Sequence, residues 1–302
     1  MNSQYGVAGL QLPHSQPDDK LQRVLSAALA EPIQRSPSID RPHYWGAEHF
    51  QLQRVKLFRE SSGIEQQQIL SLASRQLIGE AYWIEQAGVG YMAKMVLLAE
   101  TAEERMLYGL FAADEAEHLA QIRRFVPETQ PTNSGDPFLK MLAEVVETQD
   151  KALLLFAMQV VLEGWGTSHY RHLSAGCLNA ELSHLFLDFL QAESRHHASG
   201  QILFSRMVLS QASQQVIAEV MVQFLRMIQA GPQRIVAAIE RVKGHLSRSQ
   251  KLSIFEQLDT ETHSGTRLDL LRSLMQRAGG GAIVQTLEEQ GAFQAFPANR
   301  CI

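Results

Sequence analysis

Apolar residues recur along most of this chain at the three- and four-residue spacing of a buried helix face. No stretch alternates between apolar and polar residues with the period of two that a half-buried strand requires. The pattern therefore predicts an all-α protein. Four long helices are expected, over residues 64–99, 101–126, 138–173 and 179–207.

Shorter helical patterns flank these four helices. They cover residues 21–29, a lead-in segment at 47–59, and three C-terminal segments at 216–228, 234–246 and 266–277. The glycines at 279–281 are expected to end the last helix, and the tail behind them to be irregular. We predict three regions, namely an N-terminal arm at 1–45 that lies on a helical bundle at 46–210, and a C-terminal helical extension at 211–302 that packs on the bundle.

Two local signals mark helix boundaries. Thr101 and Glu104 have the spacing of a capping box, in which Thr101 accepts a backbone hydrogen bond and Glu104 reaches back. Residues 127–137 are rich in Pro, Thr, Asn, Ser and Gly and predict a linker between the second and third long helices. A long crossover at this point is typical of a four-helix bundle with one extended connection.

Composition narrows the class of protein. A length of 302 residues with 45% hydrophobic residues allows a sizeable core, and a net charge of −5 gives no electrostatic case for binding nucleic acid. Two cysteines, Cys177 and Cys301, cannot form a disulfide framework. No apolar run has the length of a membrane helix, and the polar N-terminus lacks the apolar core of a signal peptide. We expect a soluble, cytoplasmic protein with neither membrane nor nucleic acid as a partner.

Two Glu-x-x-His motifs recur at one spacing, and a further glutamate precedes each of them. Glu85 lies 30 residues before Glu115-x-x-His118, Glu163 lies 30 residues before Glu193-x-x-His196, and one shift of 78 residues relates the two sets. A single Glu-x-x-His is weak evidence, because any helix-rich protein contains a few. Two in register, each with an equidistant glutamate on an apolar face, strongly indicate a metal site of two ions.

The spacing explains how these side chains could share a metal. Residues three apart on a helix point the same way, so the glutamate and histidine of each motif can bind one ion together. Four inward carboxylates would cost too much as bare charges, whereas two divalent metals would neutralise them. Mixed carboxylate and imidazole ligands favour iron or manganese over calcium. We expect Glu85 and Glu163 to be terminal ligands, one for each metal, and Glu115 and Glu193 to bridge the two metals. His118 and His196 are each expected to bind one metal.

Glu80 competes with Glu85 for the first ligand position. It lies 35 residues before Glu115, a feasible distance between two helices, but its face is less apolar and its counterpart in the second half is Met158. The repeat therefore favours Glu85. Four other polar side chains do not lie on the same helix face as the ligands and are expected to be exposed or to lie behind them. They are Glu117, His169, His172 and His197. Trp83 and Trp165 are expected to serve in packing.

The matching residues, Glu85, Glu115-x-x-His118, Glu163 and Glu193-x-x-His196, resemble the ligand set of the ferritin-like di-iron carboxylate superfamily over about residues 64–209. The resemblance implies a ferritin-like four-helix bundle with additional N- and C-terminal helices. It also implies two iron ions, with manganese as an alternative, and O2 as a co-substrate. Members range from monooxygenase hydroxylases and desaturases to rubrerythrins and arylamine N-oxygenases, so the motif is specific for the superfamily and not for one reaction.

Residues beside the motifs narrow the resemblance. In the monooxygenase hydroxylases an aspartate precedes the glutamate of each motif and orients a histidine; Asp114 matches the first, and Ala192 replaces the second. Those enzymes also carry a threonine one turn after the third-helix glutamate, where this chain has Thr167. The resemblance thus implies catalytic roles for Thr167 and Asp114. Phe189 stands where arylamine N-oxygenases have an extra histidine, and with Phe111 it would make the cavity apolar.

The predicted function is that of an O2-dependent non-heme di-iron oxygenase or oxidase, which acts on a small hydrophobic organic substrate through a peroxo intermediate. The chain has no cysteine-rich electron-transfer module, so an external electron donor is expected, and the C-terminal helices are expected to cover the site or to form a homodimer. Two alternatives stay open. One is a metal-handling or peroxide-removing protein similar to ferritins, rubrerythrins or manganese catalases, and the other is a non-catalytic helical scaffold.

Overall fold

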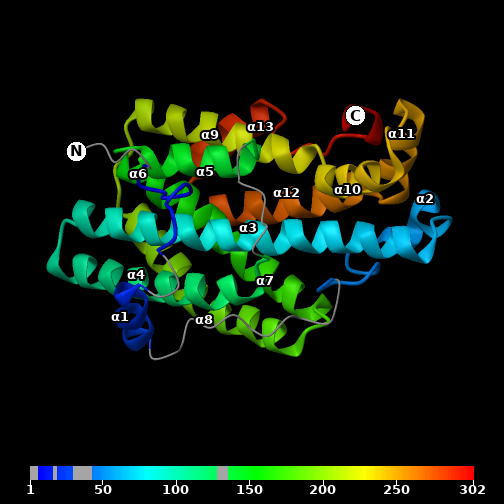
Figure 1. Cartoon of the computed structure of the whole chain (residues 1–302). Coiled ribbons are helices and arrows are strands. Elements are labelled where there is room, and N and C mark those ends of the chain that lie inside the picture. Colours follow the sequence, from blue (N-terminus) through cyan, green and yellow to red (C-terminus); the bar gives the residue numbers. More distant parts are fainter. Residues whose placement is uncertain (1–5, 16–18, 30–42, 128–134) are drawn as a thin grey trace. The chain divides into compact units, whose positions relative to one another are not determined.

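The computed structural model describes residues 6–15, 19–29, 43–127 and 135–302. Over these residues the protein is helical, and the one strand-like feature is an isolated bridge between Trp45 and Cys177 (Figure 1). The predicted all-α class is therefore confirmed. None of the helices in the described ranges is both long enough and apolar enough to cross a membrane.

The chain forms two compact units. The first contains Met1–Asp40 and Leu77–Gln149, and the second contains Arg41–Gln76 and Asp150–Ile302. A ferritin-like four-helix bundle would combine helices of both units and stays a prediction, as do the domain boundaries expected near residues 45 and 210. Parts of the predicted arm and of the predicted linker, at 1–5, 16–18, 30–42 and 128–134, lie outside the described residues.

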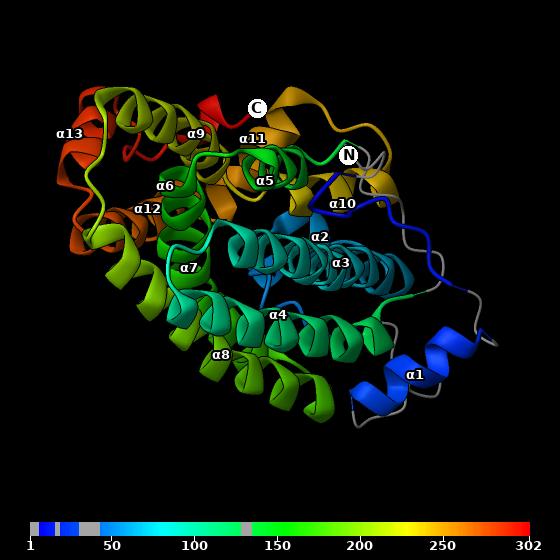
Figure 2. The same ribbon diagram turned by 90° about the vertical axis from the view of Figure 1, so that its left-hand side faces the viewer.

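The first unit is built on a helical hairpin. Its helices are α1 (Lys20–Ala28), the later part of α3 (Gly63–Leu98), α4 (Ala102–Ile122) with a 3-10 turn at Arg123–Phe125, and α5 (Pro137–Glu147). The helices expected at 21–29, 64–99 and 101–126 are thus confirmed, each to within a few residues. Because only three residues separate α3 from α4, the two helices return antiparallel and run side by side (Figure 2).

The capping signal between α3 and α4 is confirmed in part. Thr101 Oγ1 accepts a hydrogen bond from the backbone N–H of Glu104 at 3.1 Å, as expected of the N-cap residue. Glu104 does reach back, but its Oε2 accepts from the N–H of Glu100 at 3.0 Å, one residue before the cap. Both bonds satisfy backbone donors at the start of α4 and close the turn tightly.

Residues 6–15 pack along α3 within the first unit. The side-chain amide of Gln86 donates to the carbonyl of Gly9, and the hydroxyl of Tyr82 lies 3.0 Å from Nε2 of His14. Tyr82 and Gln86 are four residues apart and so share one face of the helix. This portion of the chain therefore covers the stretch of α3 that also carries the ligand candidate Glu85.

The second unit begins with less helix than the sequence predicts. In place of a continuous lead-in helix at 47–59 it has a 3-10 turn, Leu52–Arg54, and the single-turn helix α2 (Lys56–Arg59). Gln51 adopts a left-handed backbone with φ of 57°, and a helix cannot continue through that conformation.

The third long helix was predicted over 138–173 as one element, and this was wrong. The helix α5 ends at Glu147, and a new helix starts at Asp150, whose side chain accepts from the N–H groups of Ala152 and Leu153 at 2.8 and 3.2 Å. It continues through α6 (Lys151–Leu154), the π-helical segment η3 (Leu155–Glu163) and α7 (Gly164–Gly176). The apolar pattern runs across the break and hides it, because residues on both sides of the break are buried.

The fourth long helix, α8 (Ala180–Ser205), is confirmed. Asn179 begins it, and its side chain accepts from the N–H of Leu182 at 2.8 Å. The helix packs along α7 and η3 within the second unit. Trp45, which is fully buried, donates its indole N–H to the carbonyl of Leu173 at 2.8 Å and so ties the start of the unit to α7.

The C-terminal region is more helical than the sequence predicts. It contains α9 (Gln211–Gln229), α10 (Gln233–Lys243), α11 (Arg248–Gln257), α12 (Thr260–Arg277) and α13 (Gly281–Glu289), followed by a 3-10 turn at Ala298–Arg300. The expectation of an irregular tail was wrong for α13. Its residues Ile283, Val284 and Leu287 are buried, and this burial stabilises a helix that starts within a run of glycines.

Three histidines of the second unit cluster beside a cation. His49 stacks on His172 with ring centroids 4.5 Å apart, and His169 and Arg267 are close enough to affect its titration. Burial, together with His172, His169 and Arg267, lowers the pKa of His49 to about 3, and burial with Arg267 lowers the pKa of His169 to about 4. His172 is exposed, as the sequence predicts, and His169 is half-buried.

This cluster predicts acid sensitivity. A depressed histidine pKa in the folded state stabilises the fold above the unfolded-state pKa of about 6.5, and the contribution is lost as the pH falls towards the folded values. His49→Gln should therefore reduce the loss of unfolding free energy between pH 7 and pH 5, measured by urea denaturation. His184→Gln, at an exposed histidine of α8, should leave that loss unchanged. An equal pH dependence in the wild type and His49→Gln would contradict the assignment.

Candidate metal centre

The first unit brings three predicted ligands together. Glu85 comes from α3, and Glu115 and His118 come from α4. Nδ1 of His118 lies 3.1 Å from Oε2 of Glu85, and one ligand atom from each of the three residues lies within 4.8 Å of the others. All three side chains are buried, with exposed fractions of 1%, 4% and 6%. This buried Glu/Glu/His cluster could hold a metal ion.

Local geometry accounts for the cluster. Glu115 and His118 are three residues apart on α4 and so project from the same face of that helix. The antiparallel pairing of α3 with α4 brings Glu85 opposite that face. Glu80, one and a half turns earlier on α3, belongs to no group of potential ligands among the described residues.

A glycine makes room for the carboxylate of Glu115. A Cβ at Gly88, one turn after Glu85 on α3, would collide with the carboxylate of Glu115. Glycine costs helix stability compared with alanine, so its presence in a buried helix interior indicates a close approach. Here the group that approaches is a ligand candidate.

The second unit carries the matching residues. Glu163 is the last residue of the π-helical segment η3, and Glu193 and His196 lie on α8. Nδ1 of His196 is 4.0 Å from Oε1 of Glu163. His196 is fully buried and Glu193 is 5% exposed, while the side chain of Glu163 is 12% exposed. Each unit therefore has a Glu···His pair with a buried histidine, and a second glutamate that is buried.

The glycine recurs in the second unit. Gly166 follows Glu163 by three residues, as Gly88 follows Glu85, and a Cβ there would lie 3.9 Å from Oε2 of Glu193. The repeated motif is thus Glu-x-x-Gly on one helix and Glu-x-x-His on the next. Sequence reasoning missed the glycines, although the shift of 78 residues that relates the ligands also relates Gly88 to Gly166.

A buried glutamine holds the π-helical segment against α8. The side chain of Gln159, which is fully buried, donates to the carbonyl of His196 at 2.9 Å and to Oγ of Ser199 at 3.2 Å. In the other direction, Nδ1 of His197 lies 2.8 Å from the carbonyl of Gln159. π-Helical turns inside α-helices are frequent at functional sites. This one ends at Glu163, so Gln159 fixes the approach of that carboxylate to His196.

The remaining predicted residues lie as follows. Thr167 donates its hydroxyl to the carbonyl of Gly164 at 2.9 Å, within its own helix, and Asp114 is half-buried. Phe111 and Phe189 are buried, with 3% and 0% exposed, one in each unit. Roles for Thr167 and Asp114 stay predictions. Trp165 packs edge-on against the ring of Phe224, Trp83 packs edge-on against Tyr82, and Glu117 is exposed.

Comparisons of the chain with known protein families, with curated proteins and with solved structures found no match.

The close approach at Gly88 predicts an effect on metal binding. Gly88→Ala should displace the carboxylate of Glu115 and weaken binding of Mn²⁺ or Fe²⁺ at least about tenfold, as changes next to metal ligands do. The control is Gly109→Ala on α4, where nothing lies near an added Cβ. It should stabilise the protein by roughly 0.5–1 kcal/mol and leave metal affinity unchanged. Equal metal affinities of the two variants would contradict the assigned role of Gly88.

The contacts of Gln159 predict a coupled loss. Gln159→Met removes two buried hydrogen bonds and should lower the free energy of unfolding by about 1–3 kcal/mol. It should also weaken metal binding, because η3 is released beside Glu163. Ser264→Ala removes a buried hydrogen bond to the carbonyl of Ile228, far along the chain from the ligands, and serves as the matched control. Isothermal titration with Mn²⁺ measures metal affinity, and urea denaturation measures the free energy of unfolding. Weakened metal binding in both variants would contradict a specific role of Gln159 in positioning Glu163.

Proposed function

We propose that this protein is an O2-dependent non-heme di-iron oxygenase or oxidase that acts on a small hydrophobic organic substrate. The observation that carries the proposal is that each unit contains a Glu···His pair, at 3.1 Å in the first and 4.0 Å in the second, and a second glutamate that is buried. Each set alone resembles half of a carboxylate-bridged di-metal site. We propose that the two sets together bind one pair of metal ions.

Charge supports the pairing of two metals with six ligands. Glu85, Glu115 and Glu193 are at most 5% exposed, and Glu163 is nearly as buried. Four ionised carboxylates in such surroundings are unfavourable by several kcal/mol each without cations. Two divalent ions supply four positive charges and neutralise the set.

The ligand types indicate which metals fit. Oxygen and imidazole ligands without thiolates suit iron and manganese. The residues that would hold the two metals are Glu85, Glu115, His118, Glu163, Glu193 and His196. Gly88 leaves space for the carboxylate of Glu115 beside these residues.

Bound iron would supply the ability to reduce O2, which no side chain of this chain has. The protein contributes positioning and exclusion of water. Phe111 and Phe189 precede Glu115 and Glu193 by one turn, and their rings place apolar surface next to the ligands. That apolar surface favours a hydrophobic substrate over a sugar or a phosphate ester.

Two further residues have proposed roles. Asp114 precedes Glu115 and is proposed to orient a ligand histidine, and the Thr167 hydroxyl, one turn after Glu163, is proposed to hold a proton near the metals. Ala192 and Val89 stand at the equivalent positions of the other half. This asymmetry favours two unequal metals and oxygen activation over storage. Electrons would come from a separate donor or from the substrate, because the chain has only two cysteines.

The proposal predicts that the reduced, iron-loaded protein consumes O2. Protein loaded with Fe²⁺ under anaerobic conditions and mixed with O2 should take up O2 rapidly, as followed with an oxygen electrode. Glu85→Gln should lower the initial rate at least about tenfold, because it removes a ligand charge beside His118. Glu80→Gln, five residues earlier on the same helix, should leave the rate unchanged.

Other outcomes would overturn the proposal in distinct ways. Uptake of O2 that is equal in wild type and Glu85→Gln would show that the metal lies elsewhere. Evolution of O2 from hydrogen peroxide, without O2 uptake by the reduced protein, would indicate a peroxide-removing protein. Metal binding without either reaction would indicate a non-catalytic scaffold.

A further inference from the structure

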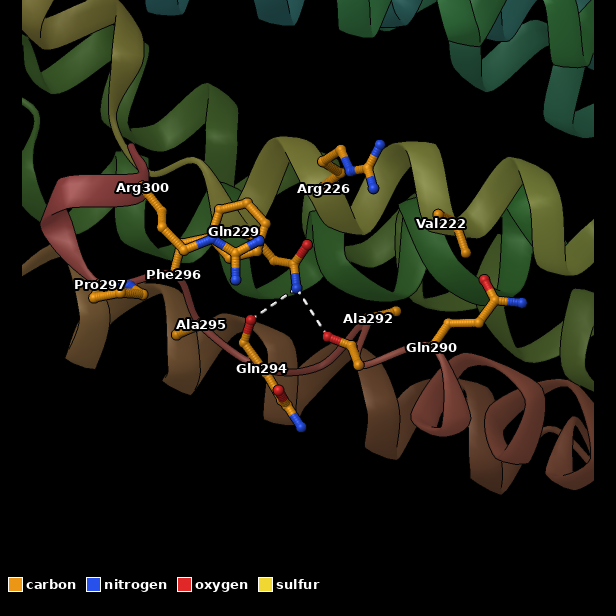
Figure 3. Close-up of a pocket in the computed structure, with 11 residues that line it drawn as sticks. Val222, Arg226, Gln229, Gln290, Ala292, Gln294, Ala295, Phe296, Pro297 and Arg300 are labelled. Atoms are coloured by element: carbon orange, nitrogen blue, oxygen red, sulfur yellow. Dashed lines mark hydrogen bonds between the residues drawn. The ribbon is translucent and has the colours of Figure 1, made fainter. Parts of the chain in front are cut away.

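A pocket in the C-terminal region lies apart from the metal ligands along the chain. It has a volume of about 580 Å³ and is formed by α9 together with residues 290–300, the segment that follows α13 (Figure 3). The volume is in the range of small-molecule sites. All of its lining residues belong to the second unit.

Two arginines give the lining of the pocket positive charge. Arg226 from α9 and Arg300 from the C-terminal turn both line it, and no aspartate or glutamate is among the lining residues. Within the described part of the chain, neither guanidinium forms an ion pair. Two arginines at one pocket, each with a planar set of donors, match the oxygens of a carboxylate or phosphate group.

The pocket has a fixed framework. Gln229, which is 5% exposed, donates through its amide nitrogen to the carbonyl groups of Gly291 and Gln294 at 3.0 and 2.7 Å. These bonds hold the C-terminal segment on α9. The amide oxygen of Gln229 points away from them, towards the side of Arg226 (Figure 3). Gln233 Nε2 donates to the carbonyl of Cys301 at 2.7 Å and anchors the segment beyond Arg300.

Apolar surface adjoins the charge. The guanidinium of Arg300 lies 4.0 Å from the centroid of the Phe296 ring, so the ring positions the cation by a cation–π contact. Val222, Ala292 and Pro297 add further apolar lining. A ligand of one charged group alone would leave this surface unused.

We infer that this pocket binds a small anion in which a carboxylate or phosphate group is joined to an apolar or aromatic body. Arg226 and Arg300 bind the anionic group, and Val222, Phe296 and Pro297 contact the body. The site needs no metal, so the inference is independent of the proposed di-iron function.

The test measures binding to the full-length protein without added metal. Phenyl phosphate and benzoate are titrated in low-salt buffer and followed by isothermal titration calorimetry, with inorganic phosphate and uncharged benzamide as comparison probes. At least one aromatic anion should bind saturably with a Kd of about 1 mM or tighter, and the preferred anion identifies the group that the arginines bind. Benzamide should bind at least about tenfold more weakly, because its neutral amide has no negative charge to pair with the guanidinium groups.

Matched arginine variants locate the site. Arg226→Gln and Arg300→Gln should each weaken binding at least about tenfold, since each removes charge-assisted bonds. Arg248→Gln, at an exposed arginine that begins α11, changes the net charge equally and should alter the Kd less than about twofold. Circular dichroism confirms that each variant is folded, as expected because both pocket arginines are exposed.

Three results would overturn the inference. They are the absence of saturable binding by either aromatic anion, an equal loss of affinity in Arg248→Gln, and an equal affinity for phenyl phosphate and inorganic phosphate. The first would exclude an anion site, the second would reduce the effect to overall charge, and the third would exclude a role for the apolar surface.

Discussion

The burial of carboxylates beside imidazoles is the constraint on which the rest of this structure depends. An ionised glutamate in an apolar helical interior is unfavourable by several kcal/mol unless a cation or hydrogen bonds compensate it. In the first unit Glu85 and Glu115 share such an interior with His118, and in the second unit Glu163 approaches the buried His196 to 4.0 Å. Divalent metals would turn this unfavourable term into a stabilising one, which explains how a helical protein can retain so much buried negative charge.

The packing around the ligands follows from that constraint. Gly88 and Gly166 each occupy a helix position where a side chain would stabilise the helix but would approach a glutamate carboxylate. Gln159 is fully buried in a π-helical segment, where its bonds to α8 compensate for weaker hydrogen bonding within the segment. Local stability is thus lower than these helices could reach, and these departures from regular helix lie next to ligand candidates. Such departures are expected where a site, and not the fold, selects the residue.

The sequence predicts most of the helices well, and it predicts that Glu85, Glu115 and His118 lie close together, because both depend on short spacings. The apolar period located α3 to within one residue at each end, and the i, i+3 geometry placed Glu115 beside His118. The break before Asp150 was missed because Asp150 caps a new helix within a continuous apolar pattern. The helix α13 was missed because the burial of its apolar residues stabilises a helix that begins within a run of glycines. The importance of Gly88 could not be predicted, because it depends on which side chain the neighbouring helix presents. The pocket with Arg226 and Arg300 likewise exists only once α9 and the C-terminal segment pack together.

The proposed function requires one pair of metal ions bound by the six candidate ligands. Electron paramagnetic resonance of protein titrated with Mn²⁺ tests it most directly, because two ions bridged by carboxylates are magnetically coupled. The account predicts two Mn²⁺ per chain and the spectrum of a coupled pair, with the six-line signal of isolated Mn²⁺ weak throughout the titration. A stoichiometry of one, or two ions that both give the spectrum of isolated Mn²⁺, would contradict it.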